Sequence, residues 1–173
     1  CLEPGVEPAR FGAYPMLLCV GEQGLRLQQC GRGAPGPVFV DFQSGAVDHR
    51  RRFGGGAGQQ VAKAIGIKPG IRPRVADVTA GLGRDGFVLA TLGCTVTLVE
   101  RSPVVSLLLK DGLTKAEGDA EIGEIIARMS LVCDDGIRWL AALEPGSESC
   151  PDVIYLDPMF PHSKKTAEVK KEM

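Results

Sequence analysis

Three glycines with the spacing GxGxxG follow a short apolar segment of the sequence. They are Gly81, Gly83 and Gly86, and the apolar segment at 75–78 is expected to be a strand. A turn of this kind between a strand and a helix lets backbone approach a nucleotide. The next expected strand ends in Glu100, whose carboxylate can accept hydrogen bonds from both hydroxyls of a ribose. The pattern predicts a site for an adenosine-containing ligand, and a purely structural strand-to-helix turn is the alternative.

Two carboxylates beside this turn indicate which nucleotide it suits. Asp77 lies four residues before Gly81, and Asp85 lies at the expected helix start. A pyrophosphate is bound at helix N-termini because the N–H groups and the dipole favour anions, so acidic side chains there would repel it. The same acids suit a cofactor with a cationic sulfonium and a free amino group. We therefore expect S-adenosylmethionine, and a nicotinamide dinucleotide is the alternative.

The segment Asp157-Pro158-Met159-Phe160 has residue types suited to methylating an amino group. An amino nitrogen on a base is a poor nucleophile, because its lone pair is delocalised into the ring. An Asp carboxylate and a carbonyl held by proline can accept its hydrogens, and an adjacent aromatic can stack on the base. The segment is similar to the (N/D)-P-P-(Y/F) motif of amino methyltransferases, with Met159 in place of the second proline. An ordinary Asp-Pro turn is the alternative.

An alternation of strands and helices is expected to position these residues. The expected strands are 75–78, 95–99, 131–133 and 153–156, and the expected helices are 59–65, 87–92, 104–113, 120–129 and 137–143. Such alternation predicts a mainly parallel sheet with helices on both faces. The fold class is therefore α/β and Rossmann-like, and the glycine turn, Glu100 and Asp157 share one edge of the sheet.

The residues before this alternation read as a small β unit. Segments 14–20 and 25–28 flank turn residues, and 38–42 is expected to be a third short strand. We expect a small N-terminal β subdomain over 1–45 and an S-adenosylmethionine-binding domain over 46–173. The chain begins with Cys1 and stops soon after its fourth α/β strand, which predicts truncation at both ends.

Asp135 and Gly136 follow the third α/β strand and form a polar corner on the same sheet edge. In Rossmann-type methyltransferases an acid at this place contacts the adenine amino group. An N-cap role for Asp134 or Asp135 in the next helix is an equal alternative, and one residue can do both.

Composition excludes several classes of protein. The chain has 173 residues, 44% hydrophobic and 24% charged, with net charge −1, which is ordinary globular composition. No apolar run reaches the ~20 residues of a membrane span. The six cysteines form no CxxC pair and there are only two histidines, so we expect reduced cysteines, no metal site and a cytoplasmic protein.

Two basic clusters interrupt this balanced charge. One contains His49, Arg50, Arg51 and Arg52, and the other contains Lys164 and Lys165 after His162. We expect these residues to hold RNA phosphates, although a charge run is more often a solvated face. His162 could also aid proton removal.

Four blocks of the sequence resemble the ribosomal RNA small subunit methyltransferase J family. They read VDFQSGAVDHRRRFGGG, TAGLGRDGFVLA, LVERSPVV and YLDPMFPHSKKTAEVKKEM. The resemblance implies a cytoplasmic enzyme that methylates the exocyclic N2 of one guanosine in 16S ribosomal RNA. It also implies cofactor contacts, which are Arg84, Asp85, Glu100, Arg101, Asp135, Gly136 and Asp157. The family sequence continues well past Met173.

Other functions remain open at this point. A nicotinamide oxidoreductase could use the same glycine turn, and an RNA-binding protein could retain a cofactor fold without catalysis. The strand-end chemistry alone also allows methylation of protein glutamine or of DNA adenine.

Overall fold

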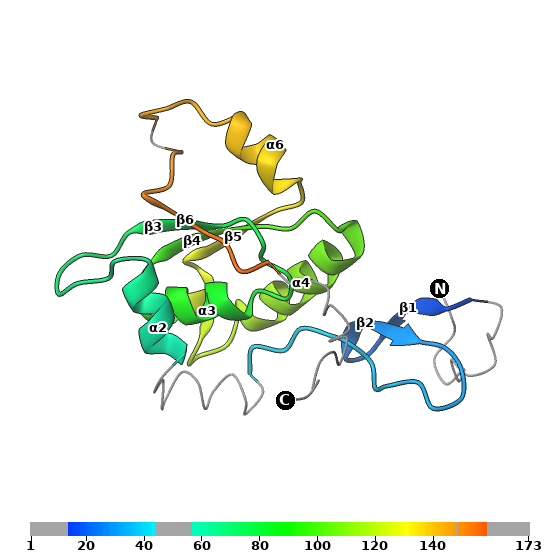
Figure 1. The fold of residues 1–173 in the computed structure, drawn as a ribbon. Coiled ribbons are helices and arrows are strands. Elements are labelled where there is room, and N and C mark those ends of the chain that lie inside the picture. The colour runs from blue at the N-terminus through cyan, green and yellow to red at the C-terminus, as the bar shows by residue number, and fades with distance from the viewer. Residues whose placement is uncertain (1–13, 44–56, 148, 159–173) are drawn as a thin grey trace, which may run out of the picture.

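The computed structural model describes residues 14–43, 57–147 and 149–158 (Figure 1). Its centre is a four-stranded parallel sheet of β3 (Arg74–Asp77), β4 (Thr95–Val99), β5 (Met129–Val132) and β6 (Val153–Tyr155). All four predicted strands are confirmed within two residues of their expected ends. The strand order is β5-β4-β3-β6, so the chain steps outward from β3 and then returns to its other side. Ligands bind open α/β sheets at such a reversal, outside the carboxyl ends of the strands.

Helices cover both faces of this sheet, as the alternation predicts. The helices are α2 (Ala57–Ala64), α3 (Arg84–Thr91), α4 (Pro103–Ala116), α5 (Gly123–Ile126) and α6 (Gly136–Ala141). Figure 1 shows α2, α3 and α4 on one face and α6 on the other. Phe87 and Leu89 of α3 and Leu108 and Leu109 of α4 are fully buried against the sheet. In the part of the chain that the structure describes, no helix is long and apolar enough to cross a membrane.

The helix expected over 120–129 is much shorter than predicted. Asp119 accepts hydrogen bonds from the N–H groups of Glu121 and Ile122, at 2.8 and 3.0 Å, in a turn before α5. At the other end, Met129 pairs with Val96 in the parallel ladder. Met129 therefore belongs to β5, although the apolar spacing of the sequence predicts a further helical turn there.

The N-terminal unit is a hairpin of β1 (Met16–Gly21) and β2 (Gly24–Gln29), paired antiparallel. It lies beside α4, where the N–H of Leu25 donates to Oδ2 of Asp111 at 3.0 Å. Figure 1 shows it at the end of α4, away from the parallel sheet. A small N-terminal β unit is thus confirmed, and the division into domains at residue 45 stays a prediction.

The third strand expected over 38–42 is wrong. Val38 makes a single bridge to Leu27, and the chain then turns into the core. Val40 packs against Gly112, because a Cβ on Gly112 would lie only 2.4 Å from Cγ1 of Val40. The ring of Phe42 stacks on the ring of Phe87, with 5.1 Å between the ring centroids. Burial of these two side chains outweighs extension of a small, exposed sheet.

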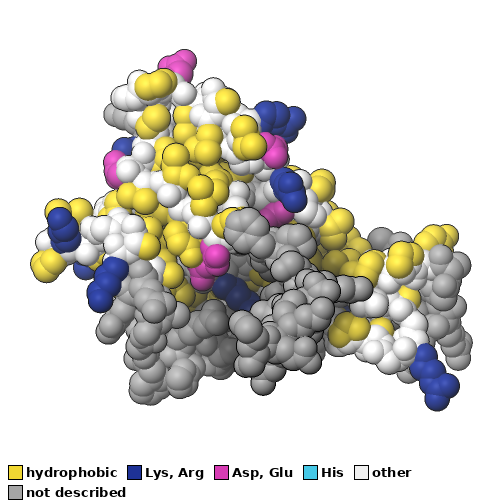
Figure 2. All heavy atoms as spheres, viewed as in Figure 1, with side chains coloured by type: hydrophobic (Ala, Val, Ile, Leu, Met, Phe, Trp, Pro, Cys, Tyr) yellow, Lys and Arg dark blue, Asp and Glu magenta, His cyan; other side chains and the backbone are white. Residues whose placement is uncertain are grey.

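Exposed apolar side chains gather around β6 and α6. Ile137 is 80% exposed and Leu156 is 61% exposed. Figure 2 shows hydrophobic side chains over the upper part of the molecule, where Figure 1 places these elements. Leu156, the first residue after β6, therefore does not anchor the following segment in the core.

Candidate cofactor and active site

The glycine turn between β3 and α3 has the geometry that its sequence predicts. Gly81 and Gly83 have φ values of 52° and 72°, in the left-handed region that favours glycine. A Cβ on Gly86 would lie 2.3 Å from Cδ2 of Leu98, so this glycine lets α3 pack on β4. A Cβ on Gly81 would make only an ordinary contact with the carbonyl oxygen of Thr79, at 3.9 Å, so in the described part of the chain no side chain packs on this glycine.

Glu100, directly after β4, is fixed against this turn. Its Oε2 accepts from the N–H of Gly81 at 2.9 Å, and its Oε1 accepts from the N–H of Ser102 at 2.7 Å. Each carboxylate oxygen has two lone pairs, so each keeps an acceptor position. The carboxylate is thus oriented in advance and can still accept from two ribose hydroxyls.

Thr79 connects the ends of β3 and β6. Its N–H and its hydroxyl both reach Oδ1 of Asp77, at 3.1 and 3.3 Å, and the N–H of Asp157 donates to its Oγ1 at 2.9 Å. Glu100 is bonded to Gly81, two residues further along the same loop. Glu100 and Asp157, which come from different strands, therefore lie on the same rim of the sheet.

The carboxylates of Asp77, Asp85 and Asp157 lie close enough at this rim for their charges to interact. Asp77 is only 2% exposed, and burial raises its pKa to about 6, with the charges of Asp85 and Asp157 adding to the effect. The hydroxyl of Tyr155 donates to Oδ2 of Asp85 at 3.0 Å, and burial together with this bond raises the pKa of Tyr155. In the described part of the chain, Oδ2 of Asp77 receives no hydrogen bond. The corner suits a ligand with positive charge.

The affinity for S-adenosylhomocysteine is expected to depend on pH through Asp77. If the ligand's ammonium requires ionised Asp77, affinity falls as pH drops through about 6. The dissociation constant should rise about tenfold between pH 7 and pH 5. Calorimetric titration across this range measures it, and an affinity that is flat in pH would exclude Asp77 from the cofactor site.

The matched control is Asp77→Asn, which keeps an acceptor for Thr79 but cannot ionise. Its affinity should be weak and independent of pH. Because the folded pKa of Asp77 is raised to about 6, its neutral form stabilises the fold at low pH, and this stability is lost as pH rises through about 6. The variant should therefore raise the free energy of unfolding by about 2–3 kcal/mol at pH 8, by about half as much at pH 5, and little at pH 3, below the ordinary pKa of the group.

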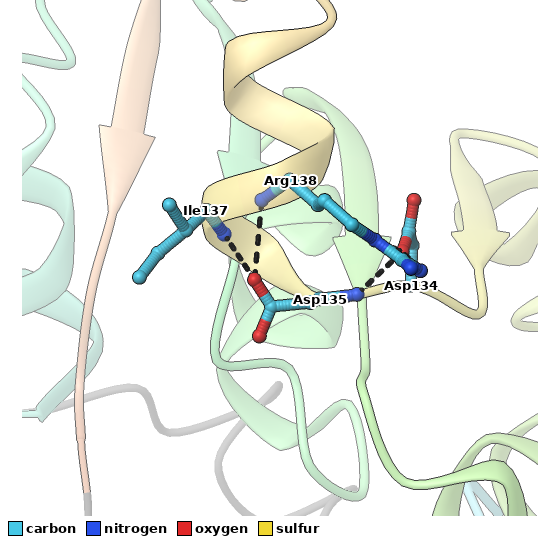
Figure 3. Close-up of polar contacts among 4 residues, drawn as sticks. All are labelled: Asp134, Asp135, Ile137 and Arg138. Carbon is cyan, nitrogen blue, oxygen red and sulfur yellow. Dashed lines mark hydrogen bonds and ion pairs between the residues drawn. The ribbon is translucent and has the colours of Figure 1, made fainter.

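The corner after β5 shows the N-cap arrangement (Figure 3). Oδ1 of Asp135 accepts from the N–H groups of Ile137 and Arg138 at 3.0 and 3.1 Å, which caps α6. Asp134 forms an ion pair with Arg138, whose hydrogen bond lowers the pKa of Asp134. A Cβ on Gly136 would lie 3.0 Å from the carbonyl oxygen of Val78, so glycine allows α6 to begin close to the end of β3. The N-cap role is confirmed, and an adenine contact by Asp135 stays a prediction.

The remaining predicted residues fall into two groups. Arg84 begins α3 and Arg101 follows Glu100, and both are exposed at this rim, as are Asp157 and Pro158. The other predicted residues lie outside the described part of the chain: His49, Arg50, Arg51, Arg52, Phe160, His162, Lys164 and Lys165. In the ranges 14–43, 57–147 and 149–158, no group of three or more His, Cys, Asp or Glu residues is placed to hold a metal ion.

Sequence reasoning missed Thr79 and Tyr155. The contact between Thr79 and Asp77 is local, and short Asp-to-backbone bonds of this kind can be expected from an Asp followed two residues later by a polar residue. Tyr155 meets Asp85 across 70 residues, so no local pattern announces it.

The arrangement fits S-adenosylmethionine on three observations. The glycine turn exposes backbone with no side chain of the described residues packed on Gly81, Glu100 keeps acceptor positions at its edge, and Asp77 with Asp85 offers negative charge for a cation. A pyrophosphate at the start of α3 would lie close to the carboxylates of Asp85, in the first turn of α3, and of Asp77, at the end of β3, which would repel it.

Comparisons with known proteins agree with this site. A family model described as "Putative SAM-dependent methyltransferase" matches residues 10–173. The chain is 58% identical over 156 residues to a ribosomal RNA small subunit methyltransferase J of Pseudomonas fluorescens, covering 90% of this chain and 59% of the relative. It is 54% identical over 174 residues to the protein of that name in Cellvibrio japonicus, covering 98% and 65%. The chain thus spans about three-fifths of the length of these curated relatives.

A solved structure is also similar. The crystal structure of a SAM-dependent methyltransferase from Neisseria gonorrhoeae matches with a TM-score of 0.67 and 40% identity, over 80% of this chain and 54% of that one. With the family model covering nearly all of the sequence, the glycine turn, Glu100 and the strand order have one common explanation: this chain belongs to the family of SAM-dependent methyltransferases.

Proposed function

We propose that this chain transfers a methyl group from S-adenosylmethionine to the exocyclic N2 of a guanosine in 16S ribosomal RNA, in the cytoplasm. The observation that carries the proposal is the anchoring of Glu100 and Asp157 on one loop, through Gly81 and Thr79. A cofactor-binding group and a base-binding group thereby share one rim. The names of the relatives support the choice of RNA as substrate.

Each proposed cofactor contact comes from a residue at this rim of the sheet. Glu100 accepts from the ribose hydroxyls, and the carboxylate oxygen of Asp135 that is not used in the N-cap accepts from the adenine amino group. Asp77 and Asp85 face the cationic end, with Gly81 and Gly83 allowing close backbone approach. The remaining proposed contacts come from Arg84 at the start of α3, Arg101 after the end of β4 and Gly136 at the start of α6.

The bound cofactor supplies an electrophilic methyl group on a sulfonium sulfur. On the protein side, the carboxylate of Asp157 and the carbonyl of Pro158 accept the two N–H hydrogens of guanine N2. This holds the nitrogen and turns its lone pair toward the methyl group, while Phe160 stacks on the base and fixes its plane. The nitrogen becomes more acidic as its new bond forms, so a carboxylate such as that of Asp157 is sufficient to accept a proton.

RNA contacts are assigned to the basic residues on either side of this rim in the sequence. They are His49, Arg50, Arg51, Arg52, His162, Lys164 and Lys165. Their positive charge would neutralise phosphates while the target base is turned out of its stack.

Replacing Arg50, Arg51 and Arg52 by alanine is expected to weaken RNA binding. Losing up to three phosphate contacts should reduce the slope of log affinity against log salt by about 2. Fluorescence anisotropy across a salt series measures this slope, and the affinity for S-adenosylhomocysteine serves as the control. An unchanged slope would remove this cluster from the RNA interface.

The test of the proposed function is radiolabelled methyl transfer to small ribosomal subunits that lack the modification, followed by identification of the labelled nucleoside. The expected product is N2-methylguanosine. Label in methyladenosine or in protein glutamine would reassign the substrate, and RNA binding without label would favour a non-catalytic role. Heat release with NAD but not with S-adenosylhomocysteine would favour an oxidoreductase.

A further inference from the structure

We propose that Thr79 is a positioning residue for the methyl transfer: its hydroxyl fixes the backbone of Asp157 to Asp77, and so holds the base-binding segment against the cofactor turn. The inference rests on the proposed function for its catalytic consequence. The anchor itself is a structural feature and can be tested without any reaction.

The direction of each hydrogen bond follows from the groups involved. The N–H of Asp157 can only donate, so Oγ1 of Thr79 accepts it at 2.9 Å. The single hydroxyl hydrogen is then available to Oδ1 of Asp77 at 3.3 Å, where a carboxylate can only accept. The result is a directed chain of two hydrogen bonds. The N–H of Asp157 donates to the hydroxyl of Thr79, and this hydroxyl donates to the buried carboxylate of Asp77.

The segment after β6 depends on this bond because little else in the described chain holds it. The last register pair of β6 is Asp77 with Tyr155, and the N–H of Val78 still donates to the carbonyl of Tyr155 at 3.2 Å. Beyond that point Leu156, Asp157 and Pro158 are all exposed. Proline has no N–H, so the N–H of Asp157 is the last donor before the Pro158 carbonyl that is proposed to hold the base.

The same hydroxyl acts on the cofactor side of the rim. Burial of Asp77 raises its pKa, whereas the hydrogen bonds from Thr79 lower it, because they favour the charged form. One side chain therefore supports the negative charge of Asp77 and sets the position of Asp157. A shift of the base-binding segment by a fraction of an ångström is enough to lower a rate substantially.

Three variants separate this role from general stability. Thr79→Val has nearly the same shape without the hydroxyl, Thr79→Ser keeps the hydroxyl, and Thr91→Val is the control. Thr91 lies at the other end of α3, where its hydroxyl donates to the carbonyl of Phe87 at 2.7 Å within the helix. The control therefore removes a hydrogen-bonded threonine hydroxyl far from the proposed site.

The first measurement is amide hydrogen exchange at Asp157, followed by NMR. Thr79→Val should speed exchange of this amide at least about tenfold by opening its only anchor in the described chain, and Thr79→Ser and Thr91→Val should leave it near the wild-type rate. Equal exchange in Thr79→Val and wild type would overturn the inference. So would loss of protection in Thr79→Ser as large as that in Thr79→Val.

The second measurement is methyl transfer at saturating cofactor. Thr79→Val should lower kcat about tenfold through misplacement of the acceptor groups, with the dissociation constant of S-adenosylhomocysteine changed less than about threefold because Asp77 keeps the Thr79 N–H. Serine should restore kcat. A kcat of Thr79→Val equal to that of wild type would overturn the positioning role. If wild type transfers no methyl group, the proposed function fails, and the exchange result still decides the anchor.

Discussion

Replacing Asp157 by alanine is expected to lower kcat for methyl transfer by about 10²–10³-fold, the loss typical of removing one preorganised polar group from the transition state. Its carboxylate is proposed to hold an N–H hydrogen of guanine N2 and to accept a proton as that nitrogen is alkylated. The backbone bond from Asp157 to Thr79 survives the change, so the segment should keep its position. Single-turnover methyl transfer to unmodified small subunits measures the effect without interference from product release.

Two further variants make this result interpretable. Asp157→Asn keeps one acceptor oxygen, and asparagine occurs at this place in the motif that the segment resembles, so a loss of about tenfold or less is expected. Asp152→Ala changes an exposed acid at the opposite end of β6, where it pairs with Arg74, and should leave kcat unchanged. Full activity in Asp157→Ala would mean that other groups hold the target amine.

Replacing Glu100 by alanine is expected to raise the dissociation constant of S-adenosylhomocysteine by about 10²–10³-fold. Two ribose hydroxyls lose a charged acceptor, and such hydrogen bonds contribute about 1.5–3 kcal/mol each. The N–H groups of Gly81 and Ser102 lose their acceptor as well, so the glycine turn becomes less ordered. Isothermal titration calorimetry measures the change directly.

The controls for Glu100 distinguish charge from shape. Glu100→Gln keeps an acceptor oxygen without the charge, and about a tenfold loss is expected. Glu117→Ala removes an exposed acid at the other end of α4 and should bind as wild type does. An affinity of Glu100→Ala within threefold of wild type would place the ribose elsewhere.

The fold could be predicted largely from periodicity. The alternation of strand-like and helical segments is sufficient to predict a parallel sheet covered on both faces, because each element has to bury an apolar face or stripe. The position of β6 beside β3 was beyond local patterns, since strand order depends on contacts between residues about 78 apart in sequence. The prediction of a third N-terminal strand is wrong because the side chain of Phe42 packs on that of Phe87 in the core instead of extending the hairpin.

The residues of the site also differ in whether local sequence patterns or long-range contacts determine their positions. The common position of Gly81, Glu100 and Asp157 at one rim could be predicted because each follows a strand of the parallel sheet, while their roles stay predictions. The contact of Thr79 could not be predicted, because it is a hydrogen bond with Asp157 across 78 residues. The N-cap role of Asp135 could be predicted because it depends only on the N–H groups two and three residues further along the chain.

A crystal structure of the chain with S-adenosylhomocysteine tests the central claim most directly. We expect the ribose hydroxyls within hydrogen-bonding distance of Glu100, and the sulfur on the side of Asp157 and Pro158. A nucleoside bound away from the loop of Thr79–Gly81, or a sulfur directed away from Asp157, would contradict the account.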